Sequence, residues 1–178
     1  MNNQISLNNV SFDFLKGSTE FLNLVMNNIS SCVLMLDKHM QLQAFNESLT
    51  TIFSSRQNEN LMYVRCGEAI GCAYNIEEMK ECGKTSHCES CGLRESAMIS
   101  YYQKIPVFKE KVAREFYMKD GKKTLKYLQF STRSFYFNKD RYIIMIVDDI
   151  SPLTQARDAL KYKKQQINKL KKQIRIVS

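Results

Sequence analysis

The sequence predicts an α+β domain with five strands in two groups. Two short apolar runs stand early in the chain, and three longer strand-like runs follow a middle segment that has neither a helical nor a strand period. The middle segment holds five of the six cysteines. Helical patterns precede the first strand and follow the last one. We therefore expect an antiparallel sheet with a cysteine-rich helical and loop insertion, an N-terminal helix and a C-terminal coiled-coil helix.

The N-terminal part predicts a tail, a helix and a hairpin. Residues 1–17 form the expected tail, and Ser18 or Thr19 can cap a helix over about residues 19–29. The runs CVLMLD and MQLQAF then surround a polar turn, which is typical of a β-hairpin. Asn46 follows the second run, so we expect its side chain to cap the short helix ESLTTIF.

The C-terminal part predicts three antiparallel strands after one short helix. The run ESAMISYY can form one or two helical turns that end before Pro106, because the residue before proline avoids helical angles. Asp120-Gly121 is a favoured hairpin turn between the next two runs, and residues 138–140 form a second turn. The last run, RYIIMIVDDI, is apolar on both alternating faces, so we expect a strand that is covered on both sides.

Heptads begin after Pro152 and predict a coiled-coil helix over residues 152–178. The a positions are Leu153, Leu160, Ile167 and Ile174, and the d positions are Ala156, Lys163, Leu170 and Val177. The flanking positions are Lys or Gln without acidic partners, so ion pairs do not favour self-pairing. The alternative is a helix packed on its own domain.

This order of elements resembles that of PAS sensor domains over about residues 18–160. Asn46 matches an asparagine that often follows the second strand of that family, and Asp149-Ile150-Ser151 matches the Asp-Ile-Thr that closes the fold. The resemblance implies a five-stranded antiparallel sheet around a helical segment where ligands bind. It implies a sensor domain over residues 18–151, with a cysteine-rich segment at 65–92, and a signalling helix from residue 152.

The cysteine-rich segment resembles a subgroup of bacterial PAS sensors, many of them attached to histidine kinases. The matching residues are Arg65, Gly67, Glu68, Gly71 and Cys72, followed by Cys82-Gly83, Cys88 and Cys91-Gly92. The resemblance implies that Cys72, Cys82, Cys88 and Cys91 hold an iron-sulfur cluster, with [4Fe-4S] as the expected type. Cys66 stands where the family usually has proline, so it is a departure and a possible alternate ligand.

Chemistry alone leaves the metal open. Four thiolates suit either a tetrahedral zinc ion or an iron-sulfur cluster. Clustered cysteines in a cytosolic chain more often bind metal than form disulfides, although unrelated free thiols or a thiol-exchange pair at Cys88 and Cys91 are alternatives. Cys32 lies among apolar residues of the first strand, where we expect a buried thiol without function.

The residues around the cysteines predict an outer shell for the metal. Glycines at positions 67, 71, 83 and 92 let the backbone turn tightly and bring N–H groups near sulfur. Arg65 and Glu68 are expected to form an ion pair beside the loop, with an ordinary surface pair as the alternative.

Composition limits the function classes. At 178 residues the chain has room for one domain and an extra element. No signal peptide is evident at the N-terminus, and the longest apolar run is far shorter than the roughly 20 residues of a bilayer-spanning helix, so we expect a cytoplasmic protein. The formal charge of +8 is concentrated after Asp158, where seven Lys or Arg occur without an acid.

We therefore expect a redox or gas sensor that controls a partner through its C-terminal helix. The expected partners are a second copy, through the N- and C-terminal helices, and a separate histidine kinase or regulator, because no kinase or DNA-binding segment follows the heptads. The alternative is that the chain is a piece of a longer protein. A zinc-stapled interaction domain is the first alternative, and nucleic-acid binding by the basic helix is the second. No catalytic constellation is found, so an enzyme is not expected.

Overall fold

The computed structural model describes residues 17–53 and 60–177 of the chain. Within this part, the sheet contains β1 (Cys32–Leu36), β2 (Leu42–Phe45), β3 (Val107–Tyr117), β4 (Lys123–Phe137) and β5 (Asp140–Asp149). The helices are α1 (Thr19–Asn28), α2 (Ser48–Phe53), α3 (Cys66–Ala69), α4 (Ala73–Glu78), α5 (Gly92–Tyr102) and α6 (Ser151–Val177). The expected α+β fold with one five-stranded antiparallel sheet is confirmed. The expected tail over residues 1–17 lies, except for Gly17, outside the described residues.

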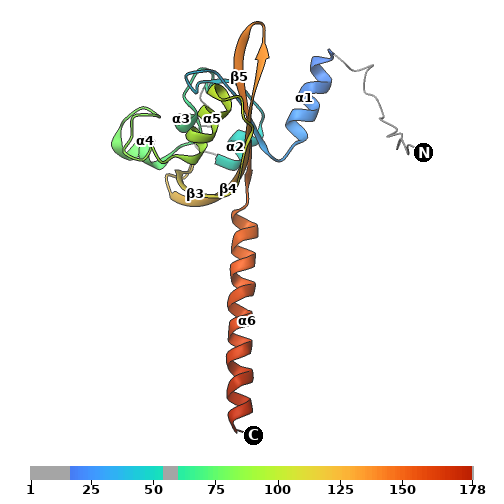
Figure 1. Cartoon of the computed structure of the whole chain (residues 1–178), viewed down its shortest axis with the longest axis vertical. Helices are drawn as coiled ribbons and strands as arrows, with labels where there is room; N and C mark the ends of the chain where they lie inside the picture. The colour runs from blue at the N-terminus through green and yellow to red at the C-terminus, as the bar shows by residue number, and fades with distance from the viewer. Residues whose placement is uncertain (1–16, 54–59, 178) are drawn as a thin grey trace, which may run out of the picture.

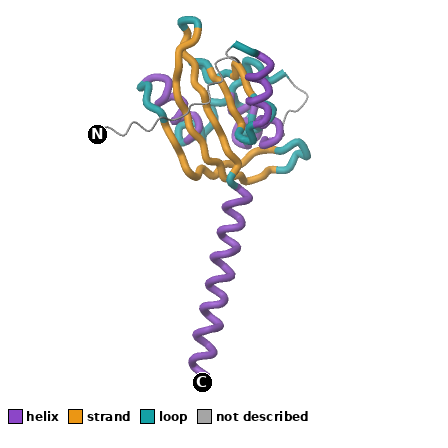
Figure 2. Tube along the Cα trace, turned by 90° about the vertical axis from the view of Figure 1, so that its right-hand side faces the viewer, coloured by secondary structure: helices purple, strands orange, loops and turns teal. Residues whose placement is uncertain are grey.

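The sheet has the strand order β2-β1-β5-β4-β3, with every neighbouring pair antiparallel. The N-terminal hairpin is joined to the three later strands by the pairing of β1 with β5, in which Leu34 lies opposite Met145. Helices α2 to α5 gather on one side of the sheet (Figures 1 and 2). The core lies between them and the sheet, and Phe53, Phe116 and Phe130 are among its largest fully buried side chains.

The central strand β5 differs from the expectation. Ile143, Met145 and Val147 are at most 1% exposed, but Ile146 on the opposite face is 37% exposed. The prediction of a strand covered on both sides was therefore wrong for the described residues. The helices between β2 and β3 all pack on the inner face, so the second row of apolar residues stays at the surface.

Asn46 does not cap α2 with its side chain. Its Oδ1 accepts a hydrogen bond from the Val33 N–H at 2.9 Å, and its Nδ2 donates to the carbonyls of Met26 and Ser31, each at 2.9 Å. The side chain is only 3% exposed. It therefore ties the end of α1 to the start of β1, a role that depends on folding of distant residues and leaves no local signal in the sequence.

The two terminal helices extend from the sheet in different directions (Figure 1). Ser18 caps α1 as expected, since its Oγ accepts from the Phe21 N–H at 3.1 Å. α1 has no buried residue. In α6, Ser151 and Thr154 are buried, whereas the described side chains of the following turns are almost all exposed. The alternative of a helix packed along its own domain was therefore wrong beyond the first turn.

None of the helices in the described part of the chain is both long and apolar enough to cross a bilayer.

Candidate metal centre

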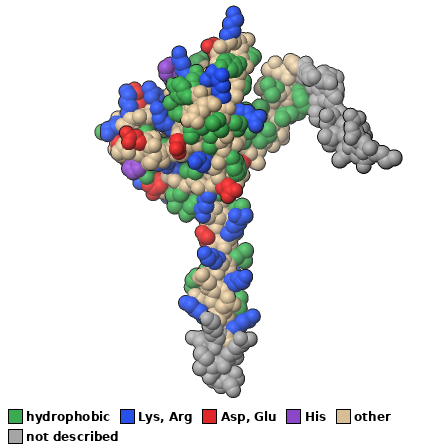
Figure 3. Space-filling view, in the orientation of Figure 1, with side chains coloured by type: hydrophobic (Ala, Val, Ile, Leu, Met, Phe, Trp, Pro, Cys, Tyr) green, Lys and Arg blue, Asp and Glu red, His purple; other side chains and the backbone are tan. Residues whose placement is uncertain are grey.

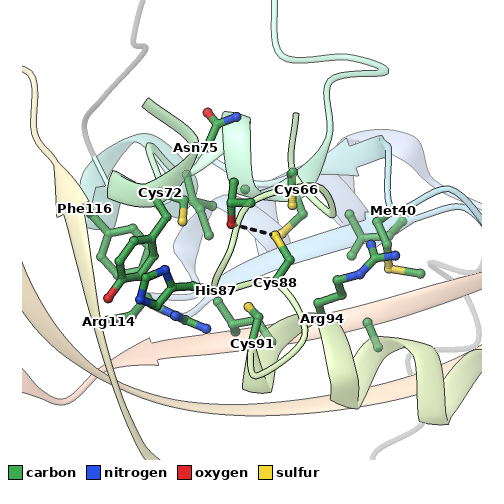
Figure 4. Close-up of a pocket in the computed structure, with 18 of the residues that line it drawn as sticks. Met40, Cys66, Cys72, Asn75, His87, Cys88, Cys91, Arg94, Arg114 and Phe116 are labelled. Carbon is green, nitrogen blue, oxygen red and sulfur yellow. Dashed lines mark hydrogen bonds between the residues drawn. The ribbon is translucent and has the colours of Figure 1, made fainter. Parts of the chain in front are cut away.

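All five cysteines of the middle segment line one cavity on the inner face of the sheet (Figure 4). The cavity has a volume of about 40 Å³. On the same measure a single water needs roughly 10 to 15 Å³, so the side chains leave more room than one solvent molecule fills. The apolar part of the wall comes from the core residues Leu36, Met40, Ile70, Leu93, Phe116 and Met145. The cysteines lining it are Cys66, Cys72, Cys82, Cys88 and Cys91.

Short helices place the cysteines around this space. Cys66 is the first residue of α3, Cys72 precedes α4, and Cys91 precedes α5. Cys82 and Cys88 come from the loop between α4 and α5. Cys72 is also fixed to the sheet, because it forms a bridge with Phe116 of β3. The segment without a regular period is thus organised around the cavity, with a backbone link to β3.

Cys88 has hydrogen-bond donors aimed at its sulfur. The Gly83 N–H donates to Cys88 Sγ at 3.1 Å, and Thr85 Oγ1 lies 3.0 Å from the same atom. Partial burial opposes ionisation, but these hydrogen bonds and the nearby charge of Arg94 hold the pKa of Cys88 below its ordinary value. Cys88 therefore forms the thiolate more readily than an ordinary cysteine, and the thiolate is the form that binds metals.

Three other cysteines are harder to ionise. Burial raises the pKa of Cys72, raises that of Cys82 to about 11, and raises that of Cys66 well above its ordinary value. Neighbouring cysteines of the cluster add to each shift, since several thiolates in one site repel one another. A set of this kind ionises together only when a cation compensates the charge, as a metal ion does.

Two arginines that the sequence analysis did not single out also line the cavity. Arg114 on β3 donates a hydrogen bond to the sulfur of Cys91, and the proximity of Cys91 raises the pKa of this guanidinium although burial opposes the shift. Arg94 on α5 lies near Cys88. Arg114 is far from the cysteines in sequence, and only the register of β3 brings it to them. No local pattern could have revealed it.

Arg65 and Glu68 hold the backbone of Cys82 from two sides. Arg65 Nη1 donates to the Cys82 carbonyl at 2.8 Å, and Glu68 Oε1 accepts from the Cys82 N–H at 3.1 Å. Arg65 also pairs with Glu81, at 3.4 Å. The expected Arg65–Glu68 pair is therefore replaced, among the described contacts, by a clamp on the peptide groups of Cys82.

The structure requires glycine at some of the four positions near the cysteines but not at all of them. A Cβ on Gly67 would stand 2.7 Å from Cys82 Sγ, closer than the sulfur could tolerate. Gly83 has a φ of 100°, which side chains rarely adopt, and its N–H reaches Cys88. Gly71 accepts a hydrogen bond from the Tyr117 N–H through its carbonyl at 2.9 Å. Gly92 begins α5, and a Cβ there would meet Val112 at an ordinary 3.7 Å, so no tight turn requires glycine.

The cysteines surround the cavity but do not already converge on one point. Within residues 17–53 and 60–177, no three His, Cys, Asp or Glu side chains stand close enough together to share one metal ion. Binding a metal at this site would therefore require thiol side chains to turn inward. Cys32 is not among the residues that line the cavity. It is fully buried on β1, and burial raises its pKa to about 12.

The chemistry of the donor set suits a soft metal centre. Sulfur ligands select zinc and iron-sulfur clusters, and the cavity offers five thiols, two guanidinium groups and an N–H donor to sulfur. The opposite wall is apolar, which keeps water away from the centre. Hydrogen bonds to sulfur and nearby charge are the features by which proteins adjust such centres.

Solved structures are similar to this chain in fold. The PAS domain of nitrogen regulation protein NR(II) from Vibrio parahaemolyticus is 10% identical, with a TM-score of 0.50 over 72% of this chain and 97% of that one. An RNA-binding light-oxygen-voltage receptor is 11% identical, with a TM-score of 0.55 over 94% of this chain and 42% of that one, so the present chain spans less than half of the receptor. No family model matches the sequence, and no curated protein matches it. The chain has the fold of a PAS domain.

Proposed function

We propose that this chain is a sensor module that holds an iron-sulfur cluster in the cysteine-lined cavity and reports its state through α6. The observation that carries the proposal is the meeting of five cysteines and two arginines at one cavity on the inner face of a PAS sheet. Scattered free thiols would not need this arrangement. A cluster, when bound, supplies a one-electron change of charge and a group that oxygen or nitric oxide can attack.

The ligands that we propose are Cys72, Cys82, Cys88 and Cys91. Cys72 and Cys91 precede two helices, and Cys82 and Cys88 lie in the loop between these helices, so modest side-chain rotations can bring their sulfurs inward. Cys66 is 7% exposed and packs in the hydrophobic core, where its thiol has the greatest difficulty in ionising. We therefore assign Cys66 to the wall of the site and keep it as the alternate ligand.

A short series of contacts joins the cavity to the start of α6. Arg114, which contacts Cys91, lies directly opposite Lys126 in the β3–β4 register. Lys126 Nζ lies 2.5 Å from Asp149 Oδ2, and Asp149 Oδ1 accepts from the Ser151 N–H at 2.9 Å. Ser151 is the first residue of α6. Only two side chains, Lys126 and Asp149, therefore separate a change of charge at Arg114 from the first residue of α6.

The proposed output is a change in the position or pairing of α6. Such coupling requires the two states of the site to favour different helix arrangements, typically by about 1 to 3 kcal/mol. Arg114 can supply part of this difference, because a thiolate ligand at Cys91 would attract its guanidinium whereas the neighbouring Lys126 repels it. The module has no proposed catalytic role, and we propose that α6 passes its signal to a partner.

The proposal is tested by purifying the full chain without oxygen and measuring iron, acid-labile sulfide and zinc. We expect brown protein with iron and sulfide in equal amounts and a broad absorption band that bleaches on reduction. Colourless protein with stoichiometric zinc would instead establish the zinc-stapled interaction domain, in which the metal only orders the loop. Protein free of both metals after anaerobic preparation and reconstitution would rule out either centre.

A further inference from the structure

α6 carries an apolar stripe that no other described element covers. Leu153, Leu160, Ile167 and Leu170 are 50%, 67%, 51% and 57% exposed, respectively. They occupy a and d positions of the heptads, so they form one narrow seam along the helix. A helix of this kind gains most of its stability from a partner on its apolar seam.

The charges beside this seam are one-sided. The e positions carry Arg157, Lys164 and Lys171, whereas the g positions carry Ala159 and Gln166. Lys163 occupies a d position within the seam itself. Between residues 159 and 171 the helix has five lysines and no acid, and basic side chains are prominent along its length in Figure 3.

A second copy of α6 is a poor partner for this surface. In a parallel pair, Lys163 would face its own copy inside the seam, and the basic e positions would face neutral g positions. In an antiparallel pair, the basic e positions would face one another. Both arrangements bring like charges together without any acid between residues 159 and 171 to compensate them.

The narrow seam also argues against a lipid or nucleic-acid surface. Helices that lie on membranes have a broad apolar face with cations along both of its edges, whereas here the seam is narrow and only one of its two flanks, the e positions, is basic. Nucleic acids attract lysines but make no use of a row of leucines spaced for helix packing. Seam and charge together fit an acidic amphipathic helix.

We propose that α6 pairs with a helix of another protein that carries apolar a and d residues, acids on the flank facing Arg157, Lys164 and Lys171, and an acid opposite Lys163. The seam continues at its N-terminal end into a groove that Phe108 of β3 and Leu153 line together with Arg157. Phe108 is 57% exposed, so the partner helix can extend onto the sheet. This surface is the output helix of the proposed function, but its pairing does not depend on the metal.

The test uses the full chain and a designed helical peptide of about four heptads. The probe has Leu at a and d, Glu at g, and Glu at the d position opposite Lys163; a control peptide has Gln in place of every Glu. We expect sedimentation of the chain alone to show no self-association through α6. The chain should bind the acidic probe at least about tenfold more tightly than the control peptide. Equal binding of both peptides, or self-association that L160D abolishes, would overturn the proposal.

Matched variants separate the seam from general charge. L160D should abolish binding of the acidic probe, and the double variant K164E/K171E should weaken it at least about tenfold. The control K161E/K169E makes the same change of charge at b and c positions outside the seam, and it should have little effect. Similar losses in both double variants would mean nonspecific attraction. Tighter binding to phosphatidylserine vesicles or to single-stranded RNA than to the probe would assign the helix to those surfaces instead. Because the assay needs no cluster, its failure would leave the sensor proposal intact.

Discussion

Arg114 and Lys126 lie directly opposite each other on β3 and β4, on the face of the sheet that carries the cavity. Like charges in this arrangement destabilise a sheet unless each has an anionic partner. Arg114 donates a hydrogen bond to the sulfur of Cys91, and Lys126 forms an ion pair with the carboxylate of Asp149. A sulfur contact at the cavity and an ion pair at the start of α6 are therefore neighbours on adjacent strands.

Replacing Arg114 should change the electron affinity of the centre. In Arg114→Met the positive charge beside Cys91 is lost, so an added electron is less well stabilised. We expect the reduction potential to fall by roughly 60 mV, which corresponds to about 1.4 kcal/mol for one electron. Potentiometric titration of the anaerobic protein measures the shift.

Arg133→Met is the matched control for this experiment. Arg133 lies on β4, next to the strand that carries Arg114. Its side chain is on the outer face of the sheet, where it is exposed beside Ile144 of β5. Removal of its charge should leave the potential unchanged within a few millivolts, because solvent screens it. An equal shift in both variants would show that Arg114 acts only through the net charge of the domain.

Asp149 should make the stability of the domain depend on pH in the acid range. Burial opposes ionisation, but the hydrogen bonds from Lys126 and Ser151 hold the pKa of Asp149 below its ordinary value of about 3.9. A lowered pKa means that the stabilisation is complete above the ordinary pKa and is lost as pH falls through the folded-state value. Asp149→Asn should therefore lower the free energy of unfolding by about 1 to 2 kcal/mol at pH 6.

Urea unfolding of apo wild type and Asp149→Asn between pH 7 and pH 2 measures this difference. The gap between the two proteins should stay constant above about pH 5 and narrow below about pH 4. Use of the apo protein removes the separate effect of metal release in acid. A gap that persists unchanged at pH 2 would mean that the carboxylate charge contributes nothing at this junction.

Substitution of Asn46 should lower the free energy of unfolding more than substitution of most other polar residues in the domain. Asn46→Ala leaves the Val33 N–H and the carbonyls of Met26 and Ser31 without their buried partner. Thermal or urea unfolding should show a loss of about 2 to 3 kcal/mol. The exposed Asn27, which accepts a hydrogen bond from the Glu47 N–H, provides a control, and Asn27→Ala should cost about 0.5 kcal/mol or less.

Periodicity and turn chemistry predict the fold of this chain well, because those signals are local. Gly121 has the positive φ that the predicted Asp-Gly turn requires, and Asn138 and Lys139 both have positive φ in the second turn. Ser18 caps α1 where the sequence predicts it. The failures concern which faces are covered, as in the exposed face of β5, because burial depends on where distant helices pack.

The cysteines of the candidate site and their neighbouring glycines can be located from the sequence, but most of the contacts around them cannot. Their spacing and glycines mark the segment, and the structure brings all five to one cavity. Arg114 enters through strand register, and the clamp on Cys82 depends on loop contacts between Arg65 and a residue far along the chain. Such contacts follow from tertiary packing, so no spacing rule reveals them.

Gly67 should be required at the centre for reasons of space. In Gly67→Ala the new Cβ would stand 2.7 Å from Cys82 Sγ, so the sulfur must move or the loop must open. We expect metal affinity to fall by about 10- to 100-fold, as when other groups that position ligands are changed. Chelator competition measures the affinity.

Gly92→Ala is the corresponding control, since its Cβ would meet Val112 at 3.7 Å in ordinary contact. It should keep full metal and gain a few tenths of a kcal/mol in stability, because alanine favours helices more than glycine does. If Gly67→Ala retains wild-type affinity, the approach of Cys82 to α3 is not part of the metal site.

The cysteines themselves give the most direct test of the ligand assignment. Cys88→Ala and Cys91→Ala should each release the metal, because a cluster held by four thiolates does not survive loss of one in this open loop. Cys32→Ala removes a sulfur on β1 that is more deeply buried than those of Cys88 and Cys91, and it should cost only about 1 kcal/mol of stability, with full metal content. Cys66→Ala discriminates further: full metal would place Cys66 in the wall, whereas metal loss in Cys66→Ala with retention in Cys72→Ala would exchange their roles. Iron and sulfide content per folded chain, measured beside far-UV circular dichroism, separates ligand loss from unfolding in every variant.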